Sequence, residues 1–394
     1  MTIDDLDMKR ILTIAAVLGL SLAAFAQNVD QGRDLSKYAD DKFGEDDKYQ
    51  VETPYATVTV SQAKPKAKIK NVIVLIGDGM GLEQVSTGWV LNGGHLNIDN
   101  FKFAGYSRTY ASDRLVTDSS AGGTGISSGI KTKYGYIGVD DDGKPVESLL
   151  HYAQKKGMKT GVTVTCRIND STPADFVCHS TDRHEEEQIA AQYVGCNVDF
   201  LSGGGLKFWK EREDGRDLVR EMQDLGYTFV DDLEGVRSFK GGKFLGLFAP
   251  LDMDPVLDRG PVLRETAKKA IEVLDNKKGF FLMIEGSQID DWAHRNKVGH
   301  MAEELFEFDK IIGDVLQFAE KDGHTLVIVT ADHATGGLTL IDGSLEERSV
   351  KVHYSTKGHN GIVVPVFAYG PHAEDFVGVY ENAELSRRIK ALMK

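Results

Sequence analysis

The chain has 394 residues and a formal net charge of −14, with 41% apolar and 27% charged residues. This composition is typical of a folded globular protein, and it excludes a mainly disordered chain or a bundle of membrane helices. The acidic charge argues against nucleic acid as a partner, because phosphate backbones bind basic surfaces.

The N-terminal segment has the layout of a secretory signal peptide. Two basic residues precede a short, mostly apolar run, and an Ala-Phe-Ala sequence ends it at Ala26. We therefore predict a signal peptide over residues 1–26, cleaved after Ala26, and an exported protein that is periplasmic or secreted. The apolar run is too short for a comfortable membrane span, so we expect none in the mature chain. A polar arm follows over residues 27–69.

From residue 70 onward, strand-like apolar runs alternate with segments of helical periodicity. The runs cover residues 71–77, 161–165, 280–285, 325–333 and 362–370, and the helical segments include 146–156, 261–275 and 301–321. This alternation predicts an α/β fold, in which a large central, mostly parallel β-sheet is sandwiched between helical layers. We expect one domain over residues 70–394.

Residues that bind metals stand at the ends of several predicted strands. Asp78 follows the first run, Glu285 closes the run at 280–285, and Asp332 and His333 follow TLVIVTA. In open α/β sheets, ligand sites lie beyond the carboxyl ends of the strands, so these side chains are predicted to share one crevice. Adjacent residues of a strand point to opposite faces, and Asp332 and His333 therefore converge only if the strand has ended before them.

A helical turn after residue 285 would bring a second set of donors together. Asp290 and His294 are four residues apart and fall on one face of a helix, and their oxygen and nitrogen atoms suit zinc. Taken singly, such residues have simpler interpretations: Asp78 as a turn residue, Thr172 as a helix cap, Arg183 as part of a solvated charge run. Their joint occurrence favours a metal-binding crevice.

The stretch LVTDSSAGGTGISSG, residues 115–129, is rich in small and hydroxylated side chains. It predicts a helix of small residues that begins with Ser119 directly after Asp118. The N-terminus of such a helix favours an anion, and small side chains let ions and substrate approach the backbone. A nearby divalent cation would make the Ser119 hydroxyl a nucleophile.

At this point the sequence closely resembles the alkaline phosphatases, a family of zinc and magnesium phosphomonoesterases. The matching motifs are TDSSAGG, IGDGMG, STPADF, IEGSQID-x-x-x-H, TADH and GHNG, in order between about residues 70 and 380. The resemblance implies a first zinc held by Asp290, His294 and His359, a second held by Asp78, Asp332 and His333, and a magnesium held by Asp78, Thr172 and Glu285. It also implies Ser119 as the nucleophile and Arg183 as the phosphate-binding residue.

The implied activity is hydrolysis of phosphate monoesters of broad specificity through a phosphoserine intermediate. Two features of the sequence depart from the pattern of known alkaline phosphatases. If Asp170 and Asp291 approach the magnesium site, they lack the lysine that some relatives have there, which leaves magnesium affinity and pH optimum open. The 25 residues between His333 and His359 are fewer than in many relatives, so a homodimer is possible but not implied. His353 is the second choice for the ligand assigned to His359.

Two other functions stay as alternatives. A phosphodiesterase or nucleotide pyrophosphatase of the same superfamily would keep both zinc sites, and a non-catalytic relative would only bind metal or phosphate. A sulfatase is excluded, because Ser119 is followed by Ser-Ala-Gly-Gly and not by x-Pro-x-Arg. The three cysteines, Cys166, Cys178 and Cys196, allow one disulfide in any of three pairings, or buried thiols.

Overall fold

The computed structural model describes residues 45–63 and 65–393. The predicted signal peptide, its cleavage point after Ala26 and residues 27–44 of the polar arm lie outside the described residues. Within the described ranges, no helix is both long enough and apolar enough to cross a membrane.

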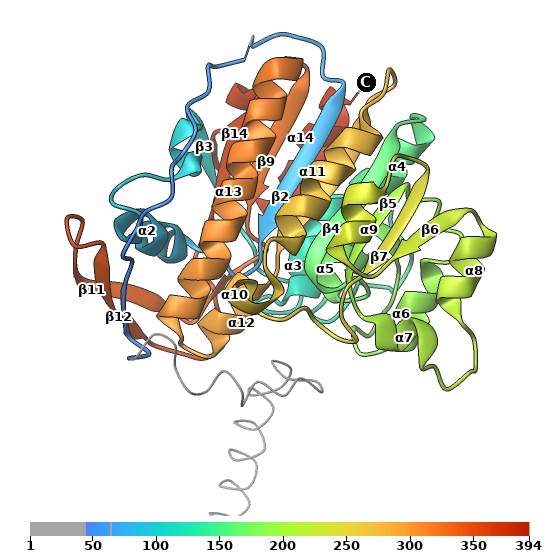
Figure 1. The fold of residues 1–394 in the computed structure, drawn as a ribbon, viewed down its shortest axis with the longest axis horizontal. Coiled ribbons are helices and arrows are strands. Elements are labelled where there is room, and N and C mark those ends of the chain that lie inside the picture. Colours follow the sequence, from blue (N-terminus) through green and yellow to red (C-terminus); the bar gives the residue numbers. More distant parts are fainter. Residues whose placement is uncertain (1–44, 64, 394) are drawn as a thin grey trace, which may run out of the picture.

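A ten-stranded sheet forms the centre of the fold (Figure 1), in the order β15-β3-β14-β9-β2-β8-β4-β5-β7-β6. Its strands are β2 (Asn71–Gly77), β3 (Phe103–Arg108), β4 (Lys159–Arg167), β5 (Phe200–Gly204), β6 (Tyr227–Val230), β7 (Lys243–Leu247), β8 (Phe280–Gly286), β9 (Thr325–Thr330), β14 (Val364–Tyr369) and β15 (Gly378–Glu381). Among these strands only β14 is antiparallel to its neighbours, β3 and β9. The predicted mostly parallel sheet is therefore confirmed.

Helices cover both faces of this sheet. In Figure 1, α11 (Val262–Leu274) and α13 (Val298–Asp322) cross in front of the central strands, and α3 (Ser119–Ser128), α4 (Leu149–Lys155), α5 (Ser171–Val177) and α14 (Asn382–Leu392) lie behind them. The other helices among the described residues are α2 (Leu82–Leu91), α6 (Glu186–Gln192), α7 (Leu206–Lys210), α8 (Leu218–Asp224), α9 (Leu233–Ser238), α10 (Val256–Arg259), α12 (Gln288–His294), and the 3₁₀ helices η2 (Asn97–Asn100) and η3 (Ala373–Phe376).

The β2 strand shows why the sequence selects this layering. All seven of its residues are buried. Ile73 and Leu75 pack into the hydrophobic core on the side of α11 and α13, while Val72 and Val74 pack into the core on the side of α4 and α14. A strand that is buried on both faces needs an unbroken apolar run, which is the pattern that predicted a parallel sheet with two helical layers.

Within the part of the chain that the structure describes, two small sheets lie outside the main one. One joins β1 (Lys48–Gln50), β12 (Ser349–Tyr354) and β11 (Leu338–Ser344), and the other joins β10 (Ala334–Thr335) and β13 (His359–Asn360). The chain from His333 to Asn360 thus contains two hairpin-like pairings, β11 with β12 and β10 with β13. All three cysteines are free thiols.

The boundaries of the predicted elements differ from the observed ones at their ends. The helix expected at 146–156 spans Leu149–Lys155, because Ser148 caps it by accepting a hydrogen bond from the backbone of His151. The strand expected at 325–333 ends at Thr330. Strands β3, β5, β6, β7 and β15 were not predicted individually.

Candidate active site

Three neighbouring strands bring the predicted metal-binding residues to one edge of the sheet. Strands β9, β2 and β8 are adjacent and parallel, so their carboxyl ends meet. Asp78 directly follows β2, Glu285 is the next-to-last residue of β8, and Asp332 and His333 lie just past the end of β9. The crevice predicted from the strand ends is therefore present, and β9 ends early enough for both residues to reach it.

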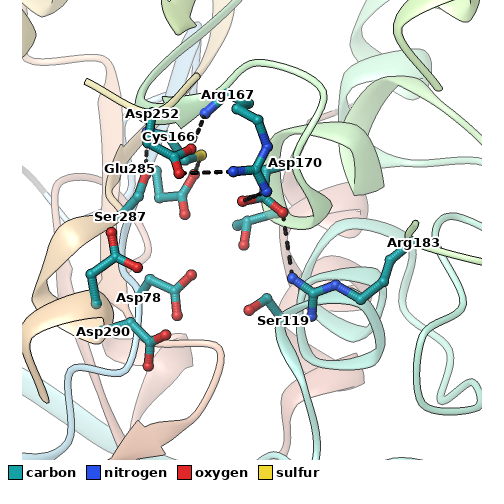
Figure 2. A pocket seen from close by; sticks show the side chains of 12 residues that line it. Asp78, Ser119, Cys166, Arg167, Asp170, Arg183, Asp252, Glu285, Ser287 and Asp290 are labelled. Atoms are coloured by element: carbon teal, nitrogen blue, oxygen red, sulfur yellow. Dashed lines mark hydrogen bonds and ion pairs between the residues drawn. The ribbon is translucent and has the colours of Figure 1, made fainter. Parts of the chain in front are cut away.

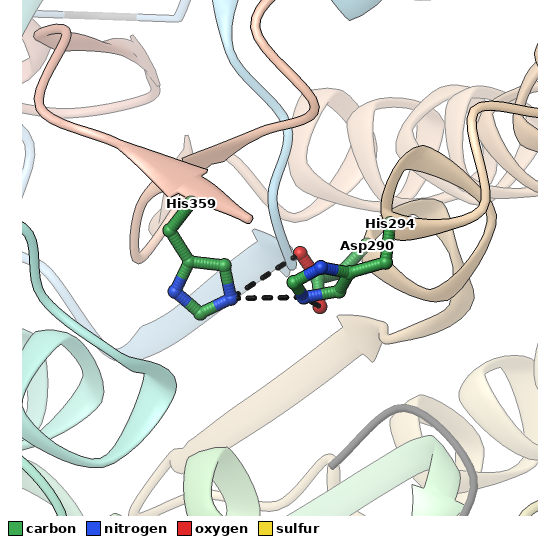
Figure 3. Close-up of side chains that lie close together, drawn as sticks. All are labelled: Asp290, His294 and His359. Carbon is green, nitrogen blue, oxygen red and sulfur yellow. Dashed lines mark hydrogen bonds and ion pairs between the residues drawn. The ribbon is translucent and has the colours of Figure 1, made fainter. Parts of the chain in front are cut away.

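The first cluster comprises Asp290, His294 and His359, whose side chains point toward one another in Figure 3. The Nε2 atoms of His294 and His359 are 3.0 Å apart, and His294 Nε2 lies 3.0 Å from Asp290 Oδ2. The helix α12 places Asp290 and His294 on one face, as predicted. His359 comes from β13 and is held by a 2.8 Å hydrogen bond between its Nδ1 and the carbonyl of Thr117. One donor atom from each of the three residues lies within 4.8 Å of the others.

The second cluster is centred on the buried His333. Its Nε2 lies 3.1 Å from Asp332 Oδ2 and 3.4 Å from Asp78 Oδ1. Asp290 also reaches this cluster, because Asp78, Asp290 and His333 offer donor atoms within 4.8 Å of one another. Glycine is required beside it: Gly79 has a φ of +65°, and a Cβ there would lie 2.5 Å from Asp290 Oδ1.

Ser119 lies beside this second cluster, at the start of α3. Asp118 caps the helix by accepting a hydrogen bond from the Ala121 N–H, and the Ser119 Oγ is 3.3 Å from His333 Nε2. The small residues of α3 are explained by close packing, since a Cβ at Gly122 would lie 2.8 Å from the carbonyl oxygen of Asp332. Alanine would force the helix away from the loop that carries Asp332 and His333.

Two arginines face each other across Asp170, as Figure 2 shows. Arg183 lies 3.0 Å from Asp118 Oδ2 and 3.4 Å from Asp170 Oδ1. Arg167 lies 3.2 Å from Asp170 Oδ2 and 2.8 Å from Asp252 Oδ2. Asp170 therefore has cationic partners even though the lysine of some relatives is absent. Burial would raise the pKa of Asp170, but the two arginines outweigh it and lower that pKa.

The third group of predicted ligands lines the same pocket. Asp78, Thr172 and Glu285 all border it, together with Asp170 and Asp291. Thr172 lies in the first turn of α5, which follows β4, the next strand after β8 in the sheet. Glu285 is buried, and burial followed by the charge of Asp332 raises its pKa well above the usual range.

The crowding of carboxylates shifts their protonation. Burial, and then the nearby charges of Asp332 and Asp290, raise the pKa of Asp78 well above its usual range. Burial, with Asp290 adding to it, raises the pKa of Asp332 to about 7. At His294, burial acts to lower the pKa, but Asp290 outweighs it and raises the pKa to about 9. Divalent cations bound among these carboxylates would favour their ionised form.

Each site residue predicted from the sequence lies in or beside this pocket, whereas His353 does not. His353 is exposed in β12, where it pairs with Thr339 in the small sheet. Sequence reasoning missed the partners that hold the site residues. The sequence marks Asp118 only as the acid before Ser119, and it assigns neither Arg167 nor Asp252 nor Cys166 to the site. Only Asp118, which is adjacent to the expected nucleophile, had a signal in the sequence.

Known proteins resemble this chain over most of its length. The alkaline phosphatase family profile matches residues 69–345. The chain is 35% identical over 352 residues to alkaline phosphatase 4 of Bacillus subtilis, covering 84% of this chain and 76% of the relative. It is 31% identical over 405 residues to the alkaline phosphatase of Escherichia coli, covering 82% and 86%.

Solved structures give the same result. The alkaline phosphatase of the Antarctic bacterium TAB5 superposes with a TM-score of 0.78 at 39% identity, covering 83% of this chain and 99% of that one. A mutant of the TAB5 enzyme with magnesium bound in its M3 site has a TM-score of 0.77. The fold and the pocket thus define a metal-dependent phosphoester hydrolase. The chain belongs to the alkaline phosphatase family, and it is a phosphomonoesterase.

Proposed function

We propose that this chain is an exported phosphomonoesterase of broad specificity, that residues 70–394 form its catalytic domain, and that it works through a phosphoserine at Ser119. The observation that carries the proposal is the position of the Ser119 hydroxyl. It lies at the N-terminus of α3, 3.3 Å from His333 Nε2 and within the pocket that Arg183 also lines. A nucleophile, an anion-binding helix end and a guanidinium therefore share one crevice.

We further propose that the pocket holds two zinc ions and one magnesium ion. The first zinc would be held by Asp290, His294 and His359, the second by Asp78, Asp332 and His333, and the magnesium by Asp78, Thr172 and Glu285. The donor chemistry fits, because imidazole and carboxylate suit zinc and an all-oxygen set suits magnesium. The buried oxygens Asp78 Oδ1 and Asp332 Oδ2 accept no hydrogen bond, as expected of acceptors reserved for cations. The magnesium bound in the TAB5 mutant supports a third site.

When bound, these ions would supply positive charge at the attacking and leaving oxygens and make the serine hydroxyl and water better nucleophiles. The residues of the chain provide the rest. The Ser119 Oγ attacks phosphorus while the bond from phosphorus to the alcohol oxygen breaks. Water then attacks phosphorus, the bond to Ser119 breaks, and inorganic phosphate leaves with the serine hydroxyl restored.

Arg183 has the geometry to hold the phosphoryl group through both steps of the reaction. Its guanidinium has five N–H donors, so the contacts to Asp118 and Asp170 do not exhaust them, and a planar fork can bind two phosphate oxygens at once. The two carboxylates orient the guanidinium, and the N–H groups at the start of α3 favour the negative charge of the phosphoryl oxygens.

The pocket lining supports broad specificity. It consists of carboxylates, two arginines, small hydroxylated side chains and one thiol: Asp78, Ser119, Cys166, Arg167, Asp170, Thr172, Arg183, Asp252, Glu285, Ser287, Asp290 and Asp291. These groups recognise ions and phosphate, and none offers an apolar surface shaped for one alcohol. A homodimer stays a prediction, which light scattering of the mature chain will test.

The first experiment compares a phosphate monoester with a diester. The mature chain is stripped of metal, zinc and magnesium are added back, and hydrolysis of p-nitrophenyl phosphate and bis-p-nitrophenyl phosphate is measured at neutral and alkaline pH. We expect strong monoester hydrolysis that returns only with zinc. A preference for the diester would favour the phosphodiesterase alternative, and turnover of neither would favour a non-catalytic binding protein.

The second experiment tests the nucleophile with a matched pair of serines. Ser119→Ala should abolish the acid-stable phosphoenzyme and turnover while leaving metal content unchanged. Ser120→Ala is the control, because the Ser120 Oγ donates a 2.8 Å hydrogen bond to Ser171 and does not contact His333. A fully active Ser119→Ala variant would overturn the assignment.

A further inference from the structure

Arg167 is a second guanidinium in the active-site pocket, and none of the predicted motifs contains it. Its side chain is 12% exposed and forms ion pairs with three carboxylates. The nitrogen–oxygen distances are 2.8 Å to Asp252, 3.2 Å to Asp170 and 3.5 Å to Glu186. Figure 2 shows Arg167 on one side of Asp170 and Arg183 on the other. The phosphatase chemistry proposed above uses Arg183 and makes no use of Arg167.

The fold holds the Arg167 guanidinium in place from two directions. Arg167 is the last residue of β4, which lies between β5 and β8 in the centre of the sheet. Asp252, in the loop after β7, accepts a 2.8 Å hydrogen bond from the backbone N–H of Arg167 and another from its Nη1. Glu186 approaches from the first turn of α6. Both ends of the Arg167 residue are therefore fixed before any contact with Asp170 is considered.

Asp170 is shared between the two arginines of the pocket. Its Oδ2 pairs with Arg167 at 3.2 Å, and its Oδ1 pairs with Arg183 at 3.4 Å. The Nη1 of Arg183 donates to the fully buried Asp118 at 3.0 Å. Each oxygen of Asp170 thus faces a different guanidinium, and the fork of Arg183 is not closed by a single carboxylate.

This division of Asp170 affects the donors that Arg183 can offer to phosphate. A guanidinium and a carboxylate pair most strongly when two parallel N–H groups meet both carboxylate oxygens. Without Arg167, both oxygens of Asp170 would be available to Arg183, and a bidentate pair would take up donors that a phosphoryl group needs. Burial favours that competing pair, because water screens charges poorly in the interior of a protein.

We propose that Arg167 is a positioning residue for phosphate binding: it holds one oxygen of Asp170 and so keeps the donors of Arg183 available to the phosphoryl group. The inference rests on the proposed role of Arg183 in holding that group. Arg167 needs no contact with phosphate, since it acts through Asp170. Its loss should weaken binding of the phosphoryl group in substrate and product alike, which raises KM and the inhibition constant of phosphate more than it lowers kcat.

The first measurement compares Arg167→Gln with the unmutated chain, both loaded with zinc and magnesium. KM for p-nitrophenyl phosphate and the inhibition constant of inorganic phosphate should each rise by about tenfold or more, the size typical when a residue that orients a site ligand is removed. Arg167→Lys should show a smaller rise, because its ammonium can still pair with one oxygen of Asp170. The lysine variant carries the test if the glutamine variant fails to fold.

Arg212→Gln is the matched control. Arg212 is 3% exposed, pairs with Asp214 and does not line the pocket. Its loss should lower the melting temperature and leave the inhibition constant of phosphate unchanged. A readout without turnover is the rise in melting temperature that inorganic phosphate produces. That rise should be smaller in Arg167→Gln than in the unmutated chain, and unchanged in Arg212→Gln.

A double variant separates positioning from direct contact with phosphate. In Arg183→Ala, the further change Arg167→Gln should leave the inhibition constant of phosphate unaltered, because its effect passes through Arg183. An equal effect in both backgrounds would overturn the inference, and so would an inhibition constant that is the same in Arg167→Gln and the unmutated chain. Failure of the proposed function looks different, because Arg183→Ala alone would then leave phosphate inhibition unchanged.

Discussion

Removal of the metal ions should add a contribution to stability that falls as pH rises, because the buried carboxylates of the site then repel one another. Asp332 is fully buried, and burial raises its pKa to about 7 from the ordinary aspartate value of 3.8. A carboxyl whose folded-state pKa is raised gives stability that is complete below its unfolded-state pKa and is lost as pH rises through the folded-state pKa. Asp78 and Glu285 shift in the same direction.

The size of the effect follows from the shift at Asp332. A tenfold change in proton affinity corresponds to about 1.4 kcal/mol, so raising the pKa of Asp332 from 3.8 to about 7 corresponds to about 4 kcal/mol in full. Between about pH 5 and pH 8 the chelated protein should lose about 3 kcal/mol of unfolding free energy from this group. For a chain of this length, that loss lowers the melting temperature by roughly 4 °C.

The assay is thermal unfolding followed by circular dichroism across this pH range, in chelator and in zinc plus magnesium. The metal-loaded protein should show the opposite trend, because cations bind the ionised carboxylates. Asp332→Asn should reduce the slope of the chelated protein, whereas Asp142→Asn, at a side chain that is 74% exposed, should leave it unchanged. His333 and His359, whose pKa values burial lowers, gain stability between about pH 5 and pH 7 and act in the opposite direction, so the test is the difference between variants. A pH slope that is the same in Asp332→Asn and in the unmutated chain would refute the reasoning.

Three further predictions concern single side chains. Arg183→Lys should lower kcat/KM by about tenfold or more, because lysine cannot form two parallel hydrogen bonds to a phosphoryl group, and steady-state kinetics with inorganic phosphate as inhibitor should show weaker binding. Gly122→Ala should reduce both activity and melting temperature, because the new Cβ would lie 2.8 Å from the Asp332 carbonyl oxygen. The loss is expected although alanine is the better helix former by about 1 kcal/mol. A variant with unchanged activity and melting temperature would contradict the packing argument. Arg259→Met should cost about 3–5 kcal/mol of unfolding free energy in urea denaturation, because it leaves two buried glutamates of α13 without their cation. Arg237→Gln, at an exposed ion pair, is the control and should leave the unfolding free energy nearly unchanged.

The features that the sequence predicts well are those set by local pattern. The apolar run 71–77 is β2 without any shift of its ends, because a strand buried on both faces must be apolar throughout. The helix that begins at Ser119 was predicted from an acid followed by small residues, and Asp118 is indeed its N-cap. The meeting of Asp78, Glu285 and His333 also followed from strand ends alone, since parallel strands place their carboxyl ends at one edge.

The features that the sequence does not predict depend on contacts between distant segments. Strand β14 resembles the parallel strands in composition, and only its place between β3 and β9 makes it antiparallel. Asp252 comes from a loop without a motif, yet it accepts hydrogen bonds from both the backbone and the guanidinium of Arg167. That contact matters for the site, because Arg167 forms an ion pair with Asp170 on the side opposite Arg183. The motifs therefore identify the groups that meet the phosphate and the ions, while the residues that hold those groups in place are chosen by the fold. Substitutions at Asp252 or Arg167 should consequently alter the kinetics of the enzyme even though no motif of the family marks either residue.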